Sequence, residues 1–320
     1  MDHSNTSRQT IVIDCDPGQD DAIAILLALG AHEALDVRAI TTVSGNVPVE
    51  ITQRNACIVR DWAGKTATLP VYAGCSRPLA REPFTAADVH GESGLEGLEL
   101  HEPLAPVAGQ HAVDWLVEML SAAVPASVTI CAIGPLTNIA TALLQAPQIC
   151  ASVREIVLMG GAYFQRGNAT PVAEFNLYVD PDAAEIVFSS DVPIVVLPRD
   201  AAVNAPITPA RIAPIRAIGN RCGNVVADLM EAILAFNVRR RGLAEAPMYD
   251  PLTIGYLIDP SLFGGRAVNV VIETAGKWTL GETVVDWTGR TGRTINAKWI
   301  NEVDADSFYT MLCEKIRNLP

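Results

Sequence analysis

Four aspartates lie within eight residues near the start of the chain, in the segment Asp14-Cys15-Asp16-Pro17-Gly18-Gln19-Asp20-Asp21. The β-branched run 11–13 precedes this segment and a long apolar stretch follows it, so it joins the end of a strand to the start of a helix. In an open α/β sheet, ligands bind at that edge. Clustered carboxylates repel one another unless a cation or a shared proton relieves them, and hard oxygen ligands suit Ca²⁺ or Mg²⁺. The segment therefore predicts a metal site.

These aspartates have two other possible interpretations. An aspartate at a helix N-terminus caps free amide groups and complements the helix dipole, which accounts for one or two of the four. A strand-end Asp-x-Asp also occurs in phosphotransferases of the haloacid dehalogenase type, which use magnesium. Their pattern continues with Thr or Val where this chain has Gly18, and it lacks the pair Asp20-Asp21. That class also needs a Lys and a Ser or Thr at later strand ends, and no convincing pair is present.

The elements that must position these aspartates alternate along the chain. Strands are expected at 11–13, 37–43, 127–133, 155–159 and 193–197, and helices at 21–30, 47–62, 135–144, 180–189 and 224–241. This alternation predicts an α/β fold with a single-domain, open, mostly parallel, doubly wound sheet and helices on both faces. Segment 75–109 fits the pattern badly and is expected to form a loop over the site. From Ala267 onward, extra antiparallel strands near the C-terminus and a final helix are expected.

Composition and charge narrow the class of protein. With 320 residues, 49% of them hydrophobic, the chain can bury one large core. A net charge of −13 opposes binding to nucleic acid. Because no apolar run reaches spanning length and the start lacks a targeting pattern, we expect a cytoplasmic protein without a membrane partner. Seven cysteines without a Cys-x-x-Cys pair predict neither a disulfide framework nor a structural zinc site.

Several motifs together resemble the nucleoside hydrolase family of the inosine-uridine preferring type. After the aspartate segment come Thr41-Thr42-Val43-Ser44-Gly45-Asn46, Ile133-Gly134-Pro135-Leu136-Thr137-Asn138, Met159-Gly160-Gly161, Gly167-Asn168-Ala169-Thr170-Pro171-Val172-Ala173-Glu174-Phe175-Asn176, and Asp250-Pro251. Motifs in family order are more specific than any one alone. The resemblance covers nearly the whole chain and implies a nucleoside hydrolase-like catalytic domain over 11–320, with 1–10 as a disordered N-terminal tail.

The resemblance also implies a metal and a mechanism. The family holds Ca²⁺ with aspartates and one backbone carbonyl, which correspond here to Asp16, Asp21, Asp250 and the carbonyl of Ile133. It implies calcium-dependent hydrolysis of the N-glycosidic bond of ribonucleosides to free base and ribose. A metal-bound water would attack C1′, and Asp16 would be its general base. Asp14 is interpreted as orienting its neighbours rather than binding the metal.

Carried over residue by residue, the family's substrate contacts involve carboxylates, amides and one strand-end methionine. They correspond to Asp20, Asn46, Met159, Asn168, Glu174, Asn176 and Asp250. Asn46 and Asn168, each beside a glycine, are also typical turn residues. Glu174 and Asn176 are expected on one side of an extended stretch, because side chains alternate with a period of two.

On the base side, this chain departs from the family. Inosine-uridine preferring members carry a His before the last metal-binding Asp, and this chain has Tyr249 there. A phenol is a weaker proton donor than an imidazolium, although it can hydrogen-bond or stack on a base. His90 matches a family pocket histidine on a mobile loop, or is a surface loop histidine. The preference for purine or pyrimidine therefore stays open.

Two alternatives to a nucleoside hydrolase remain. One is the magnesium-dependent phosphohydrolase, and the other is a ribose- or nucleoside-binding protein of the same fold with weak or no activity. The replaced His favours the binding protein, and the retained metal-site aspartates oppose it. The resemblance further implies a homodimer or homotetramer.

Overall fold

A nine-stranded sheet runs through the molecule. The computed structural model describes residues 8–320. The strands are β1 (Gln9–Cys15), β2 (Leu35–Thr42), β3 (Val71–Ala73), β4 (Val128–Ala132), β5 (Val153–Met159), β6 (Ile194–Leu197), β7 (Phe263–Ile272), β8 (Thr283–Asp286) and β9 (Ala297–Val303). Their order is β3-β2-β1-β4-β5-β6-β9-β7-β8. All pairs from β3 to β9 in this order are parallel, whereas β7 is antiparallel to both β9 and β8.

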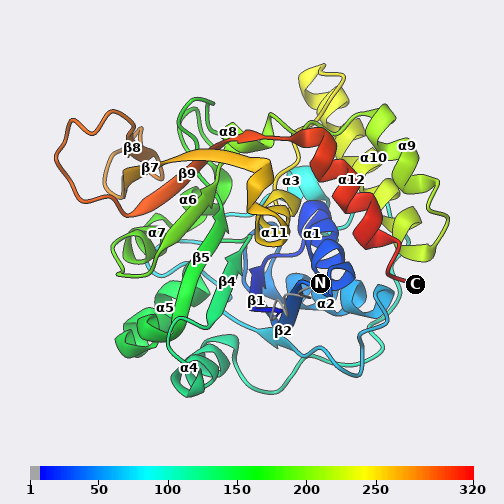
Figure 1. Cartoon of the computed structure of the whole chain (residues 1–320), viewed down its shortest axis with the longest axis horizontal. Coiled ribbons are helices and arrows are strands. Elements are labelled where there is room, and N and C mark those ends of the chain that lie inside the picture. Colours follow the sequence, from blue (N-terminus) through cyan, green and yellow to red (C-terminus); the bar gives the residue numbers. More distant parts are fainter. Residues whose placement is uncertain (1–7) are drawn as a thin grey trace, which may run out of the picture.

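Twelve α-helices and two short 3₁₀ segments surround the described part of the sheet. They are α1 (Gln19–Gly30), α2 (Val49–Trp62), α3 (Ala87–His90), α4 (Ala112–Ala122), α5 (Thr137–Gln145), η1 (Pro147–Ser152), α6 (Phe175–Val179), α7 (Pro181–Phe188), α8 (Arg199–Ala202), α9 (Pro209–Arg216), α10 (Arg221–Arg241), α11 (Pro251–Ile258), η2 (Pro260–Leu262) and α12 (Ala305–Ile316). Figure 1 shows the β7–β8 hairpin projecting at the left, away from α9, α10 and α12 at the right.

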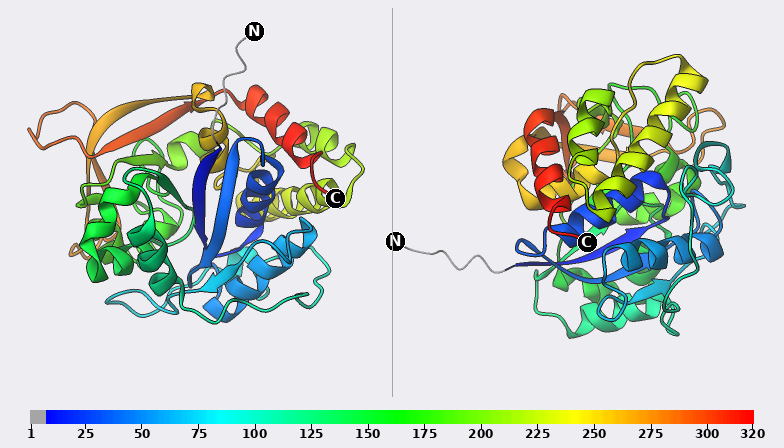
Figure 2. Two further views of the ribbon diagram at one scale, coloured as in Figure 1. Left: turned by 60° about the horizontal axis from the view of Figure 1, so that its bottom comes forward. Right: turned by 90° about the vertical axis from the view of Figure 1, so that its right-hand side faces the viewer.

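Both faces of the sheet are buried. Successive side chains of a strand point to opposite faces, so Ile11 and Ile13 pack in one core and Val12 in another. The first core contains residues of α1, α2, α10, α11 and α12, and the second contains residues of α4, α5 and α7. Figure 2 shows the green helices on one side of the central strands and the red and yellow-green helices on the other. This is the doubly wound arrangement predicted from the sequence.

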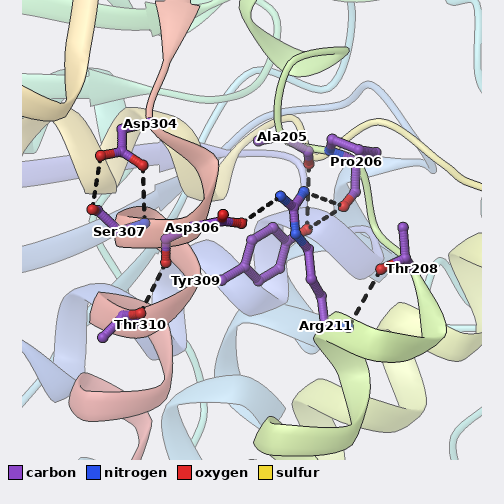
Figure 3. A network of polar contacts seen from close by, with 9 residues as sticks. All are labelled: Ala205, Pro206, Thr208, Arg211, Asp304, Asp306, Ser307, Tyr309 and Thr310. Atoms are coloured by element: carbon purple, nitrogen blue, oxygen red, sulfur yellow. Dashed lines mark hydrogen bonds and ion pairs between the residues drawn. The ribbon is translucent and has the colours of Figure 1, made fainter.

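A polar network joins α12 to the segment before α9. The guanidinium of Arg211 donates to the carbonyl of Pro206 and to Asp306, each at 2.9 Å, and lies 4.7 Å from the ring centroid of Tyr309 (Figure 3). Asp304 caps α12 by accepting from the amide of Ser307 at 3.1 Å (Figure 3). These contacts fix the C-terminal helix on the α9 side.

Most expected elements are present, and several others were missed. Each expected strand and helix occurs within a few residues of its predicted bounds, and the antiparallel strands and final helix near the C-terminus are confirmed. The expected tail falls mostly outside the described residues, but Gln9 and Thr10 belong to β1. Strand β3 and helices α3, α4, α6, α8, α9 and α11 were not predicted. In the described chain, no helix is both long and apolar enough to cross a membrane.

Candidate active site

A pocket of about 320 Å³ opens at the carboxyl ends of the parallel strands. Asp16 follows β1, Ile133 follows β4, and Met159 ends β5. All predicted site residues except Asp16 and Asp21 line this pocket, namely Asp20, Asn46, His90, Ile133, Met159, Asn168, Glu174, Asn176, Tyr249 and Asp250. The topology therefore gathers residues that lie far apart in the sequence into one cavity.

Three carboxylates converge at this pocket. One oxygen each of Asp20, Asp21 and Asp250 lies within 4.8 Å of the others. Asp21 also has the capping function considered from the sequence, because it accepts from the amides of Asp16 at 3.1 Å and Gly18 at 3.0 Å. Asp21 therefore caps α1 and also belongs to the carboxylate cluster.

Asp16 lies beside this cluster and is fully buried. Its Oδ2 accepts from the amide of Asn46 at 2.7 Å, whereas its Oδ1 has no hydrogen-bond partner within residues 8–320. Glycines make room for this carboxylate, since a Cβ at Gly45 would lie 2.1 Å from Oδ2 and one at Gly134 would lie 2.6 Å from Oδ1. A buried carboxylate oxygen without a hydrogen-bond partner is costly, and a bound cation would stabilise it.

The mutual repulsion of these aspartates also favours a bound cation. Burial and the charge of Asp20 raise the pKa of Asp21 to about 7. Burial raises the pKa of Asp16 and of Asp250 well above the ordinary range, and the neighbouring aspartates raise both further. A bound cation would remove this penalty, and an all-oxygen donor set suits a hard divalent ion. The residues present therefore fit a site for a hard divalent cation.

Asp14 is fully buried, and it belongs neither to the pocket lining nor to the carboxylate cluster among the described residues. Its Oδ2 accepts from Thr41 Oγ1 at 2.5 Å and from Asn138 Nδ2 at 2.8 Å. Asn138 Nδ2 also donates to the carbonyl of Thr42 at 3.0 Å. Asp14 thus ties the ends of β1 and β2 to α5, and these contacts support its predicted orienting role.

Glu174 and Asn176 do not lie on an extended stretch, so that prediction was wrong. Glu174 caps α6 by accepting from the amide of Asn176 at 3.0 Å, and it also accepts from the amide of Gly161 at 3.1 Å. Asn176, inside the first turn, donates from Nδ2 to the carbonyls of Ile133 at 3.0 Å and Met159 at 3.1 Å. A helix turn, rather than strand alternation, brings both residues to the pocket. Burial raises the pKa of Glu174 to about 6.

His90 ends α3, within the segment expected to lie over the site. Its Nδ1 lies 2.7 Å from Gln19 Oε1, and Gln19 Nε2 donates to the carbonyl of Glu96 at 3.3 Å. Gln19 Oε1 is therefore an acceptor, which places the imidazole hydrogen on Nδ1 and leaves Nε2 as an acceptor. Burial lowers the pKa of His90. His90 is half-buried and lines the pocket, as the pocket interpretation expects.

Helix α10 forms a less polar wall of the same pocket. Ile233 and Phe236 line it, as does Arg240, which pairs with Asp88 of α3 at 2.9 Å. The Arg240 side chain is still largely exposed, so it stays solvated while it pairs with Asp88. None of the five tryptophans occurs among the described residues that line the pocket.

Sequence reasoning missed Arg199. This residue begins α8 directly after β6, and its guanidinium donates from Nη1 to the phenol oxygen of Tyr249. Its position just past a buried strand, at the ligand-binding edge of the sheet, was the signal that could have revealed it. The partner, Tyr249, was predicted.

The fold and the acidic pocket define an α/β enzyme with its site at the carboxyl edge of a parallel sheet. The family model for inosine-uridine preferring nucleoside hydrolases matches residues 11–310. The chain belongs to this family and is a ribonucleoside hydrolase, an N-ribosyl glycosidase.

Similar proteins cover almost the whole chain. "Uncharacterized protein C1683.06c" of Schizosaccharomyces pombe is 45% identical over 97% of this chain and 99% of its own length. The "Pyrimidine-specific ribonucleoside hydrolase RihA" of Salmonella arizonae is 43% identical over 96% of this chain and 98% of its own length. Among solved structures, a purine-preferring ribonucleoside hydrolase from Gardnerella vaginalis matches with a TM-score of 0.89 and 29% identity, over 97% of this chain and 98% of that one.

Proposed function

We propose that this protein hydrolyses pyrimidine ribonucleosides to free base and ribose in a calcium-dependent reaction. The observation that carries the proposal is the buried, unpartnered Oδ1 of Asp16 beside three converging carboxylates. The pyrimidine preference is supported by the name of the relative at 43% identity, whereas the similar purine-preferring structure is 29% identical.

The residues that would hold the ion are Asp16, Asp21, Asp250 and the carbonyl of Ile133. When bound, Ca²⁺ would supply positive charge that lowers the pKa of a water and orients the ribose hydroxyls. The side-chain amide of Asn176 donates from Nδ2 to the Ile133 carbonyl and holds it in place.

Asp16 is the proposed general base. It accepts a proton from the attacking water as the water oxygen bonds to C1′ of the ribose. The bond from C1′ to the base nitrogen breaks, and its electron pair leaves with the base. The rigid contact of Asp16 Oδ2 with the Asn46 amide holds the carboxylate in one orientation for this step.

The ribose is proposed to bind among the polar side chains of the pocket floor. Asp20, Asp250 and the amides of Asn46 and Asn168 line this floor, and such groups suit a polyol. As the bond to the base breaks, positive charge develops on the ribose ring, and nearby carboxylates stabilise it. The acidic floor therefore suits the proposed transition state.

The two alternatives receive less support. A phosphohydrolase needs cations for its phosphate, yet the described pocket lining holds no lysine, and its Arg240 is paired with Asp88. A binding protein would be expected to lose part of the metal site, yet Asp16, Asp21 and Asp250 all remain together.

The experiment that tests the proposal is ribose release from uridine, cytidine, inosine, adenosine and guanosine with added calcium. We expect release from uridine and cytidine at kcat/KM values at least about tenfold above those for the purine nucleosides. Faster release from inosine or guanosine would contradict the pyrimidine preference. No release from any nucleoside would favour the binding protein.

A further inference from the structure

Arg199 is rigidly held behind the wall of the pocket. Its backbone amide donates to the carbonyl of Gly161 at 2.9 Å, and its Nε donates to the carbonyl of Arg166 at 2.7 Å. The residue is 8% exposed and is not among the described residues that line the pocket. Both anchors lie in the segment that follows β5, so the guanidinium has a fixed position.

The contact between Arg199 and Tyr249 determines how the phenol is used. Nη1 donates to the phenol oxygen, and Cζ lies 5.7 Å from the ring centroid. A guanidinium has no acceptor, so the phenol oxygen must accept in this contact. The phenol hydrogen is therefore directed to an acceptor other than Arg199. Because Tyr249 lines the pocket, Arg199 can act on a bound molecule through it.

The charge of Arg199 complements the carboxylates of the pocket. Asp20, Asp250 and Glu174 line the pocket, whereas Arg199 lies behind Tyr249. Cleavage of an N-glycosidic bond separates charge, because the ribose becomes positive while the departing base becomes negative. Carboxylates on the ribose and a cation-polarised phenol on the base would stabilise both developing charges.

We propose that Arg199 is a positioning residue that makes Tyr249 a hydrogen-bond donor to the departing pyrimidine. The proposal rests on the function proposed above. The electron pair of the C1′–N1 bond goes to N1, and the resulting charge spreads onto the adjacent carbonyl oxygen. The phenol donates a hydrogen bond to this base and keeps its proton. The base then takes a proton from solvent water, and the proton that Asp16 accepted is released to neutralise the hydroxide that remains. The arrangement replaces proton transfer from the family histidine, which this chain lacks.

The test compares leaving groups of different quality in otherwise similar substrates. Fluorine in 5-fluorouridine withdraws electrons, so its base departs more readily than uracil and needs less assistance. The full-length calcium-loaded protein and its Arg199→Met, Arg199→Lys, Tyr249→Phe and Arg199→Met/Tyr249→Phe variants are assayed on both nucleosides.

For Arg199→Met we expect kcat on uridine to fall about tenfold or more, as after loss of one charge-stabilising donor. The ratio of kcat on 5-fluorouridine to kcat on uridine should rise by roughly threefold or more. Tyr249→Phe should show the same fall in kcat on uridine and the same rise in the ratio. The double variant should be no slower than Tyr249→Phe, because Arg199 acts through Tyr249. Arg199→Lys, which keeps the charge, should recover part of the rate.

Arg211→Met is the matched control, because Arg211 also contacts a tyrosine ring but lies at the α9–α12 junction (Figure 3). It should leave both rates unchanged. An unchanged ratio in Arg199→Met, with equal losses on both nucleosides, would overturn the proposal and assign Arg199 a purely structural role. Additive losses in the double variant would also overturn it. If the unmodified protein releases ribose from neither nucleoside, the proposed function itself fails.

Discussion

At the scale of single residues, Asp16 combines features that protein interiors usually avoid. Its side chain is fully buried, one oxygen has no partner in the described chain, and the neighbouring carboxylates raise its pKa. Such an arrangement lowers the stability of the folded protein, and proteins retain it mainly where the group serves a function. We attribute this cost to the two proposed roles of Asp16, which are metal binding and proton abstraction from water.

Replacing Asp16 should therefore abolish activity and preserve the fold. We expect Asp16→Ala to lower kcat on uridine by about 10³-fold or more, since both proposed roles are lost. The Tm of the metal-free variant should equal or exceed that of the metal-free parent, because a repelling buried carboxylate is gone. Steady-state kinetics and thermal unfolding measure these effects, with half-buried Asp36→Ala as control. Near-parental activity would disprove the role of Asp16.

His90 should make stability depend on pH. The unfolded chain protonates His90 near its ordinary pKa of 6.5, whereas burial lowers that pKa in the folded chain. The unfolded state then binds more protons as pH falls through 6.5 and below, so the stability present above pH 6.5 is progressively lost. As the pH is lowered from about 7.5 to about 5, we expect the Tm of the parent to decrease relative to the Tm of His90→Gln. A constant difference would show that His90 does not titrate in this window.

The sequence revealed residues whose chemistry is concentrated locally, and it missed Gln19 and Arg199, whose partners are distant. Asp16 and Asp21 lie in one short segment, so their clustering is visible without a structure. Gln19 meets His90 across 71 positions, and Arg199 meets Tyr249 across 50. Such pairs arise only when the sheet brings separate loops together.

At the scale of elements, the loop between β5 and α6 depends on one buried carboxylate. Asp200 accepts from the amides of Phe164 at 3.0 Å and Gln165 at 2.8 Å, and from Trp299 Nε1 at 2.8 Å. These contacts fix the loop that leads to Asn168. The carboxylate therefore connects α8 and β9 to the pocket wall.

Asp200→Ala should accordingly destabilise the protein. It leaves several buried donors unpaired, and we expect the free energy of unfolding to fall by roughly 3 kcal/mol or more. Denaturant unfolding measures the loss, with the exposed Asp191→Ala as the matched control. A change below about 1 kcal/mol would mean that water replaces the carboxylate at this position.

The ion pair between Asp88 and Arg240 links α3 to α10 across the pocket. Both side chains are 58% exposed, so the pair should contribute little to stability. We expect Arg240→Ala to shift Tm by no more than about 1 °C and to raise KM for uridine roughly threefold, because α3 is held over the substrate less often. The charge-swapped variant Asp88→Arg/Arg240→Asp should restore KM. No change in KM for Arg240→Ala would argue against this linking role.

Periodicity predicted the long elements well and the short ones poorly. Strands β1, β2, β4, β5 and β6 and helices such as α1 and α10 were predicted within a few residues. Helix α6 has five residues, too few to show a period, and its start is fixed by the Glu174 cap. The alternation assumed for Glu174 and Asn176 therefore gave the wrong geometry.

At the scale of the whole molecule, the site is a product of sheet topology. Asp16 follows β1 and Asp250 precedes α11, yet they are close enough that the charge of Asp16 adds to the burial that raises the pKa of Asp250. Packing of α1 against α11 in one core brings these ends together. The fold class could be predicted from strand–helix alternation, whereas the pairing of these ends required the structure or the family resemblance.

The assembled site should need calcium for activity, and uridine hydrolysis by the metal-free protein measures this need most directly. After exhaustive chelation, with metal content checked by elemental analysis, we predict a loss of kcat of about 100-fold or more and a lower Tm. Re-addition of calcium should restore both. Full activity in protein proven to be free of divalent metal would contradict the proposed calcium dependence.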